Sequence, residues 1–171
     1  LQLNQLDLTA KGDLSSGYQL LCKAILPAEK GPVDVLLQGT VDAKGAQISG
    51  LDLTAGEQQS LKLTAQLDWQ EGLSAEAKIA WLDFPWHRLY PLIDEPQVAL
   101  RTFNGEISYK DGNYLGNFKA DLDGPAGRFN VVTPFSGDLK QVFLPELKLT
   151  AGQGKAEGHL NLQFADGIAW D

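Results

Sequence analysis

Hydrophobic and polar residues alternate strictly in the middle of the chain. Every second residue is apolar over 61–69, and the alternation resumes over 73–81 after a short connection at 70–72. Successive side chains of a strand point to opposite faces, so each run predicts a half-buried strand. A three-residue loop that contains Gly72 is typical of an antiparallel hairpin. This stretch therefore predicts two paired strands with one apolar and one polar face.

The same unit returns near the end of the chain. The segment LDLTAG at 51–56 recurs as LKLTAG at 147–152, and the alternating strand that follows, 156–164, matches 61–69. A turn at 165–167 takes the place of 70–72, and a shorter echo, LDLTA, stands at 6–10. Self-similarity of this kind predicts a repeat-built, stacked architecture. We divide the single segment 1–171 into approximate units 1–50, 51–96, 97–146 and a truncated 147–171.

Short alternating runs continue on both sides and predict about twelve strands, without a long helical period. Pro134 and Pro145 interrupt two of the runs, which predicts edge or kinked strands there. Only residues 83–93 do not read as sheet. Asp83 is a candidate cap and Pro91 a candidate stop, so we expect one short helical turn that lies against an apolar face.

A sheet of this length must curl or close, because open twisted sheets rarely exceed roughly ten strands. At roughly 4.8 Å per strand, twelve strands extend about 58 Å, which is long for a compact domain of this size. The prediction is an all-β fold, an elongated and curled antiparallel or mixed sheet that forms a trough with an apolar inner face. A barrel or sandwich filled by its own side chains is the alternative.

Composition narrows the classes of function. The net charge of −8 argues against nucleic-acid binding and against docking on an anionic bilayer. Cys22 is the only cysteine, so no intrachain disulfide forms, and its apolar neighbours indicate a small core residue. No apolar run is long enough for a membrane helix. Because the sequence contains no Met, we interpret it as an excerpt of a longer protein.

Residues with catalytic chemistry are sparse. The two histidines, His87 and His159, lack a metal-binding spacing, and the acids are scattered singly through turns and polar faces. The sequence contains no nucleophile elbow, phosphate-binding loop or dinucleotide-binding motif. We predict no enzymatic activity, no catalytic residue, no metal and no cofactor.

The repeat resembles a known family. A Gly-led strand at 39–42, the LDLTAG strand, an alternating strand that ends in Leu67-Asp68-Trp69, and a Gly-turned return strand together are similar to the AsmA-like/TamB family. That resemblance implies a β-taco in a periplasmic segment of a protein anchored in the inner membrane of Gram-negative bacteria. It further implies that phospholipid acyl chains move along a groove between the two membranes. It also implies an outer-membrane partner, a TamA-type barrel, bound through a region outside this chain.

With this resemblance, the apolar faces become the expected lining of a groove for phospholipid or other apolar chains. The segment 83–93 would cover part of that groove through Phe84, Trp86, Leu89 and Tyr90. The predicted lining residues are Leu51, Leu53, Leu61, Leu63, Leu67, Trp69, Leu73, Ile79, Trp81, Tyr114, Phe118, Leu122, Leu147, Leu149, Leu160, Leu162 and Phe164.

Two other interpretations stay open. One is a chaperone-like groove or sheet edge that accepts strands of outer-membrane proteins during their assembly and secretion. The other is a self-filled β-sandwich or solenoid with a structural or carbohydrate-binding role. A compact shape would favour the latter.

Overall fold

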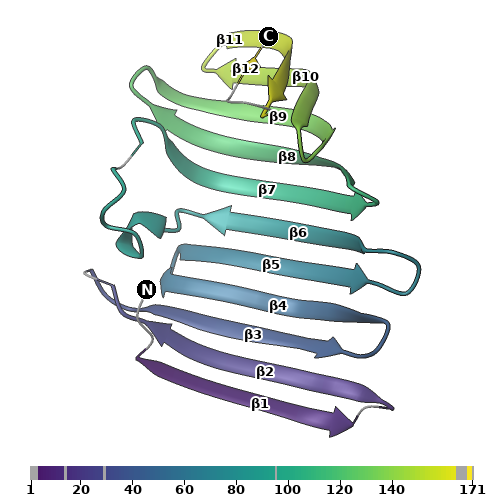
Figure 1. Cartoon of the computed structure of the whole chain (residues 1–171). Coiled ribbons are helices and arrows are strands. Elements are labelled where there is room, and N and C mark those ends of the chain that lie inside the picture. The colour runs from purple at the N-terminus through teal and green to yellow at the C-terminus, as the bar shows by residue number, and fades with distance from the viewer. Residues whose placement is uncertain (1–3, 14, 29, 95, 165–168, 171) are drawn as a thin grey trace.

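A computed structural model describes residues 4–13, 15–28, 30–94, 96–164 and 169–170. This part of the chain forms one antiparallel sheet of twelve strands whose spatial order equals their order in the sequence (Figure 1). The all-β prediction is confirmed, although the turn expected at 165–167 lies outside the described residues. The strands are β1 Gln5–Asp13, β2 Gly17–Leu26, β3 Val33–Val41, β4 Gly45–Gly56, β5 Gln59–Asp68, β6 Ser74–Leu82, β7 Ala99–Lys110, β8 Asn113–Gly124, β9 Gly127–Asp138, β10 Gln141–Ala151, β11 Gly154–Gln163 and β12 Ala169–Trp170.

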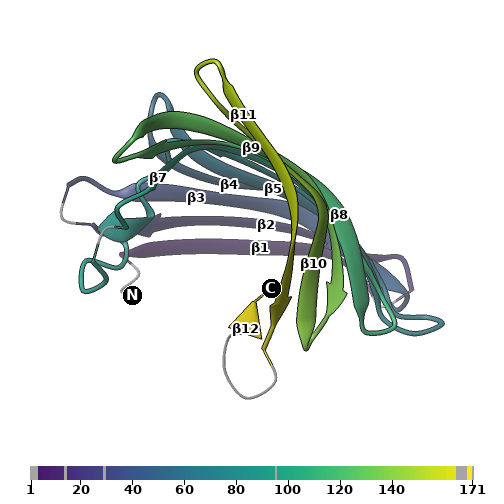
Figure 2. The ribbon, with the colours of Figure 1, turned by 90° about the horizontal axis from the view of Figure 1, so that it is seen from above.

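The sheet stays open. β1 and β12 lie at opposite ends of the strand order, and no pairing joins them in the described part of the chain. Seen from above, the strands arch, and the short helix η1 (Trp86–Arg88) lies on the hollow side of the arch (Figure 2). The curled trough is therefore confirmed, and the closed barrel is wrong. The fully buried core is correspondingly small among the described residues, and comprises Ala24, Leu26, Val33, Phe84 and Ala120.

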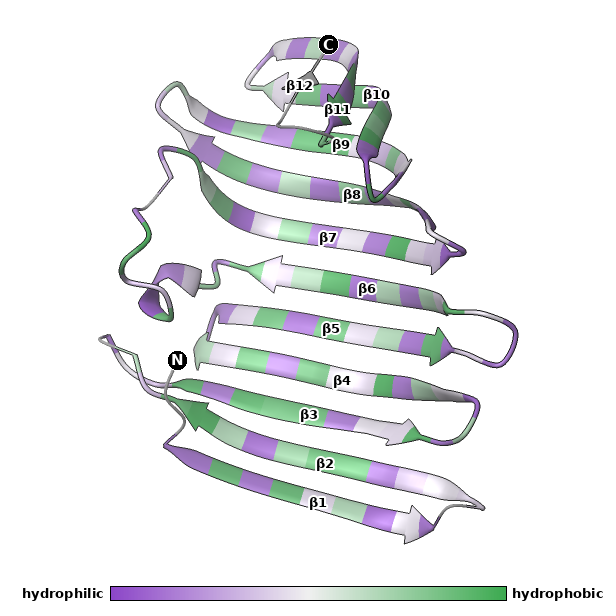
Figure 3. Cartoon of the chain, in the orientation of Figure 1, coloured by the Kyte–Doolittle hydropathy of each residue, from purple (hydrophilic) through white to green (hydrophobic). Residues whose placement is uncertain are grey.

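Strand register explains why the apolar residues gather on one side. Along each strand, hydrophobic and hydrophilic positions alternate as bands (Figure 3). The pairing sets apolar against apolar: Leu63, for example, lies opposite Leu51 on β4 and Ile79 on β6. Because the side-chain period of a strand is two, a one-residue slip would turn a whole strand over.

Both copies of the repeated segment begin at a β-bulge. The register shifts between Ile48 and Leu51 in β4, and between Leu144 and Leu147 in β10. Each bulge reverses the parity of the strand, so that the apolar residues before and after it face the same side. Pro145, which cannot donate a backbone hydrogen bond, lies inside the second bulge, which confirms the predicted kink.

The segment between β6 and β7 contributes Phe84 to the main buried cluster. Phe84 packs on Leu26 and Val33, and its ring meets the Trp81 indole edge-on at a centroid distance of 5.3 Å. Trp86 and Leu89 pack against this cluster, whereas Tyr90 is half exposed. The predicted helical turn on the apolar face is thus present as η1.

The expectation that Asp83 caps this turn is wrong. Pro85 occupies the position before η1, and no side chain caps it. Asp83 instead adopts a positive φ of 40°, and its carboxylate accepts a hydrogen bond from Arg101 at 3.2 Å. Arg101 also donates to Asp123, so an arginine on the neighbouring strand β7 holds the carboxylate that follows β6.

Aspartates shape several hairpins at one rim of the sheet. The carboxylate of Asp42 accepts the backbone N–H groups of Lys44 and Gly45, and that of Asp138 accepts those of Lys140 and Gln141. In the β1–β2 turn, the Ser15 hydroxyl and backbone amides donate to Asp13 and hold the pKa of that carboxyl far below its usual range. Such Asx turns match the backbone of a tight reversal.

Removing the ring of Phe84 should destabilise the whole sheet. Phe84 is only 4% exposed, so we expect Phe84→Ala to lower the free energy of unfolding by about 3–5 kcal/mol. The matched control is Leu92→Ala in the same segment, whose side chain is 98% exposed and should cost less than about 0.5 kcal/mol. Urea denaturation followed by circular dichroism measures both. Equal midpoints for the two variants would contradict the assigned core.

Acid should weaken the sheet through Asp121. The Thr102 hydroxyl on β7 and the Asn130 amide on β9 donate to this β8 carboxylate at 2.6 and 2.7 Å and lower its pKa. A depressed folded-state pKa gives stability that is present above the unfolded value, about 3.9, and lost as the pH falls through the folded value. We expect Asp121→Asn and Thr102→Val to flatten the dependence of stability on pH below about 4, measured by urea denaturation. Wild-type acid sensitivity in both variants would refute this role.

Candidate apolar binding face

Cross-strand pairing lines up the inward side chains into four rows that run across the strands. Row 1 passes without interruption through eleven strands, from β1 to β11, and row 4 continues to the backbone of β12. Rows 2 and 3 are continuous from β1 to β9, where the second bulge interrupts them. We call these four rows the apolar face. Row 1 consists of Leu6, Ala24, Val35, Leu53, Leu61, Trp81, Phe103, Ala120, Val131, Leu149 and Ala156.

The other rows have the same character. They contain aliphatic and aromatic residues, glycines, Cys22 and Thr133, and no charged side chain at any paired position. Thr133 is fully buried, and its hydroxyl donates to the carbonyl of Pro134 at 2.7 Å. The face therefore presents no unsatisfied polar group to a ligand at that position.

Two halves of the apolar face differ in chemistry. From β2 to β5 the paired residues are mainly Leu, Val and Ala, whereas β7 to β9 carry several aromatic residues, four of which form a chain of neighbouring rings. Phe118 stacks on Phe103 at a centroid distance of 5.4 Å and reaches Phe135 at 6.1 Å, and Phe135 lies 6.2 Å from Tyr114. Trp81 on β6 stands between the halves. We call the four rings the aromatic floor.

Glycines let these rings lie close to the sheet. A Cβ on Gly105 would come within 2.8 Å of the Phe103 ring, and one on Gly116 within 2.6 Å of the Phe135 ring. The same holds for Gly137, over which the Tyr114 phenol passes to donate to the Gln141 carbonyl at 2.9 Å. Because these glycines have no side chain, the rings of the aromatic floor lie directly against the backbone of the sheet.

The register places most of the residues expected from the sequence on this face. Leu51, Leu63, Ile79 and Phe118 belong to row 2, and Leu67 and Tyr114 to row 4. The following predicted residues also lie on it: Leu53, Leu61, Trp81 and Leu149 in row 1, Leu162 in row 4, Leu122 beyond row 1, Leu160 beside row 3, and Leu147 after the bulge.

Three predicted lining residues lie at strand ends instead. Trp69 follows β5, is partly exposed, and donates its indole N–H to the Ala43 carbonyl at 2.9 Å. Leu73 lies in the β5–β6 turn and Phe164 follows β11, and both are exposed. At the other end of the strands, Phe84, Trp86 and Leu89 cover residues of β2 to β6.

Sequence reasoning missed Phe103 and Phe135 as well as the contributions of β1 to β3. The alternation over 33–41 carried the signal for Val35 and Leu37, which share a face with Leu53 and Leu51. For Phe103 the signal was obscured, because the register shift between Leu100 and Thr102 reverses parity just before it. The glycines opposite the rings were the remaining clue.

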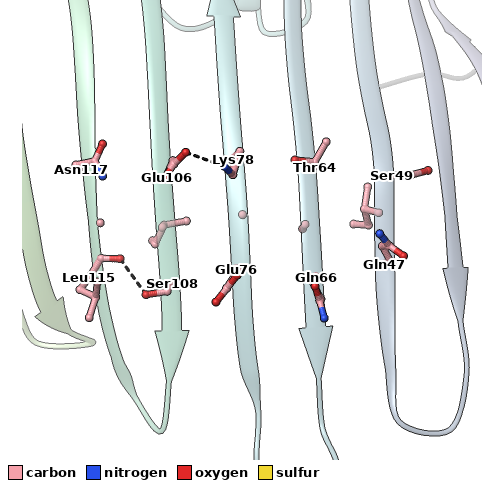
Figure 4. A pocket seen from close by; sticks show the side chains of 15 residues that line it. Gln47, Ser49, Thr64, Gln66, Glu76, Lys78, Glu106, Ser108, Leu115 and Asn117 are labelled. Carbon is pink, nitrogen blue, oxygen red and sulfur yellow. Dashed lines mark hydrogen bonds and ion pairs between the residues drawn. The ribbon is translucent and has the colours of Figure 1, made fainter.

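Charged residues lie on the other face of the sheet. There Lys78 pairs with Glu106 at 2.9 Å, and this partner raises the pKa of the lysine. A shallow hollow of about 540 Å³ crosses this face from β4 to β8, and Figure 4 shows the pair among its polar lining. Gln66, Glu76 and Ser108 line the same hollow. Leu115 also lines the hollow, but an apolar ligand there would have to desolvate the Lys78–Glu106 pair.

Two further features of the described residues concern metal binding and membrane crossing. No group of three or more His, Cys, Asp and Glu side chains in that part of the chain is arranged to hold a metal ion. No helix there is long and apolar enough to cross a membrane.

Comparison with known proteins adds no relative. No family model, no curated protein and no solved structure matches this chain. The character of the apolar face therefore has to be judged from its own geometry.

A methyl group at Gly116 should disturb the aromatic floor. It would overlap the Glu106 carbonyl oxygen and the Phe135 ring, so Gly116→Ala should lower the free energy of unfolding by about 1–3 kcal/mol. It should also shift the NMR signals of the Phe135 ring. Gly158→Ala is the matched control, because a Cβ there meets nothing within 4 Å, and it should be neutral. Equal stability of the two variants would contradict the described packing of the rings.

Proposed function

We propose that this chain binds acyl chains along its apolar face and lets them move across the strands. One observation carries the proposal: rows of uncharged side chains run through successive strands without a charged interruption. The sheet is unclosed, so these rows are not filled by a facing sheet in the described part of the chain. An extensive apolar surface of this kind favours an apolar partner.

The affinity expected for an acyl chain is weak, which suits movement along the apolar face better than tight binding at one position. A fully buried methylene contributes about 0.8 kcal/mol, and an open face covers only one side of a chain, so each methylene gains roughly 0.4 kcal/mol. About ten methylenes in contact then give roughly 4 kcal/mol, equivalent to a Kd near 1 mM. Contacts this weak and this uniform allow an acyl chain to exchange between neighbouring strands.

The resemblance to AsmA-like/TamB proteins extends the proposal to a biological setting. In that setting the cargo is phospholipid, and the chain is a periplasmic segment of an inner-membrane-anchored protein that conducts lipid between the inner and outer membranes. The TamA-type barrel of that family is then the partner of the full-length protein.

A second candidate rests on a different feature, the outer edge of β1. In the described residues β1 pairs only with β2, and its other edge presents unpaired backbone groups. Such an edge can accept a further strand, as a chaperone for outer-membrane β-barrel proteins would require. Crosslinks from β1 to a client strand, undiminished by polar substitutions on the apolar face, would favour this function.

A charge on the apolar face should abolish acyl-chain binding. Leu63 lies in row 2 and its neighbour Thr64 is exposed on the polar face, so the pair forms a matched test on one strand. We expect Leu63→Asp to reduce binding of a fluorescent fatty acid at least tenfold, because a carboxylate would have to be desolvated beneath the ligand. Thr64→Asp should bind like the wild type. Fluorescence titration of the 171-residue chain measures both.

Folding of the variants is checked by circular dichroism and urea denaturation. Leu162→Asp provides a second test in row 4, far from the core around Phe84. The proposal is wrong if both folded Asp variants bind the fatty acid as well as the wild type does. It is also wrong if the wild type does not bind the fatty acid.

A further inference from the structure

An exposed apolar tip projects from the segment that covers the apolar face. The tip consists of residues 90–93, and its large side chains are unusually exposed: Tyr90 is 50%, Leu92 98% and Ile93 54% accessible. In Figure 2 this segment loops out beside η1 on the hollow side of the sheet. Exposure of three neighbouring apolar side chains to water is unfavourable, and contact with an apolar partner would remove them from water.

The tip is an ordered turn. The backbone N–H of Ile93 donates to the Tyr90 carbonyl at 3.1 Å, which places Pro91 and Leu92 at the two corners of a β-turn. Proline is favoured at the first corner of a β-turn, so the sequence suits this turn. Leu92 is therefore directed outward by a defined backbone conformation.

The base of the tip is fixed to the sheet. The Tyr90 N–H donates to the His87 carbonyl at 3.2 Å, so the turn continues directly from η1. The Arg88 guanidinium donates to the Ala55 carbonyl at 3.3 Å and to Gln59 Oε1 at 3.1 Å, across the β4–β5 turn. Because the turn is already held in one conformation, its apolar side chains lose little conformational entropy when they bind an apolar partner.

We propose that the tip inserts into the interfacial region of a zwitterionic lipid bilayer. Tyr side chains favour this region, and the half-exposed Tyr90 belongs to the tip. Asp94 adjoins the tip and the chain carries a net charge of −8, so attraction to anionic lipid is not the driving force. The driving force of the proposed binding is therefore the transfer of the apolar side chains of the tip from water into the bilayer.

The inference goes beyond the proposed lipid path and does not depend on it. Three side chains give a weak and reversible contact, comparable to or weaker than a single acyl anchor. Together with the proposed function, such a contact would bring one rim of the apolar face to a membrane surface for a short time.

The test uses the 171-residue chain and phosphatidylcholine vesicles in a co-sedimentation assay. Leu92→Asp should weaken partitioning at least tenfold, since an inserted leucine becomes a carboxylate. The matched control is Leu139→Asp, because Leu139 is 85% exposed in the β9–β10 turn at the opposite rim and stands alone. It should bind within about twofold of the wild type, and both variants should unfold at the wild-type urea midpoint.

Four results would overturn the inference. The wild type could ignore phosphatidylcholine vesicles, it could bind only after anionic phosphatidylglycerol is added, or Leu92→Asp could bind as well as the wild type. The fourth is sedimentation that reveals a dimer lost in Leu92→Asp, which would assign the tip to a protein contact. Leu63→Asp distinguishes the two proposals: it should keep vesicle binding through the tip while it loses fatty-acid binding on the apolar face.

Discussion

The register of the antiparallel ladder is the constraint on which the structure depends. Each strand pairs with the next in chain order, and the pairing determines which side of the sheet every residue occupies. Pairs such as Leu61 with Trp81 and Phe103 with Ala120 extend one row from β1 to β11. A sheet of this kind has little buried core to stabilise it, so its stability must come largely from the ladder and from partial burial between neighbouring rows.

Because the sheet is open and its apolar face is uncharged, that face is accessible to an apolar ligand over most of its area. The few fully buried apolar residues lie mostly where the segment after β6 folds back, around Phe84. Elsewhere the face is half-buried by its own neighbours, which leaves it both folded and accessible. The aliphatic half and the aromatic half offer different surfaces to a ligand, since flat rings over glycines present broad contact areas with few rotatable bonds.

Alternation allowed the strands to be predicted, and most of the lining residues that it indicated lie on the apolar face. The number of strands, rather than the alternation, favoured an open sheet over a closed barrel. Alternation could not give the role of Asp83, because Arg101 lies on another strand and decides the orientation of that carboxylate by a tertiary contact. It also missed Phe103, whose parity is reversed by a register shift that no local propensity indicates. Trp69 was assigned to the face by extrapolating the alternation past the end of β5, where the backbone already turns.

The two bulges that open the repeated segments have a geometrical effect on any longer assembly. They occur in β4 and β10, six strands apart, which corresponds to roughly 29 Å along the sheet at about 4.8 Å per strand. A bulge raises the local right-handed twist and bends its strand. Tandem copies of this unit would therefore repeat the extra twist of these bulges every six strands, together with the twist at the register shift in β7. Insertion of a single hairpin between two bulges would change the phase of that twist without altering either face.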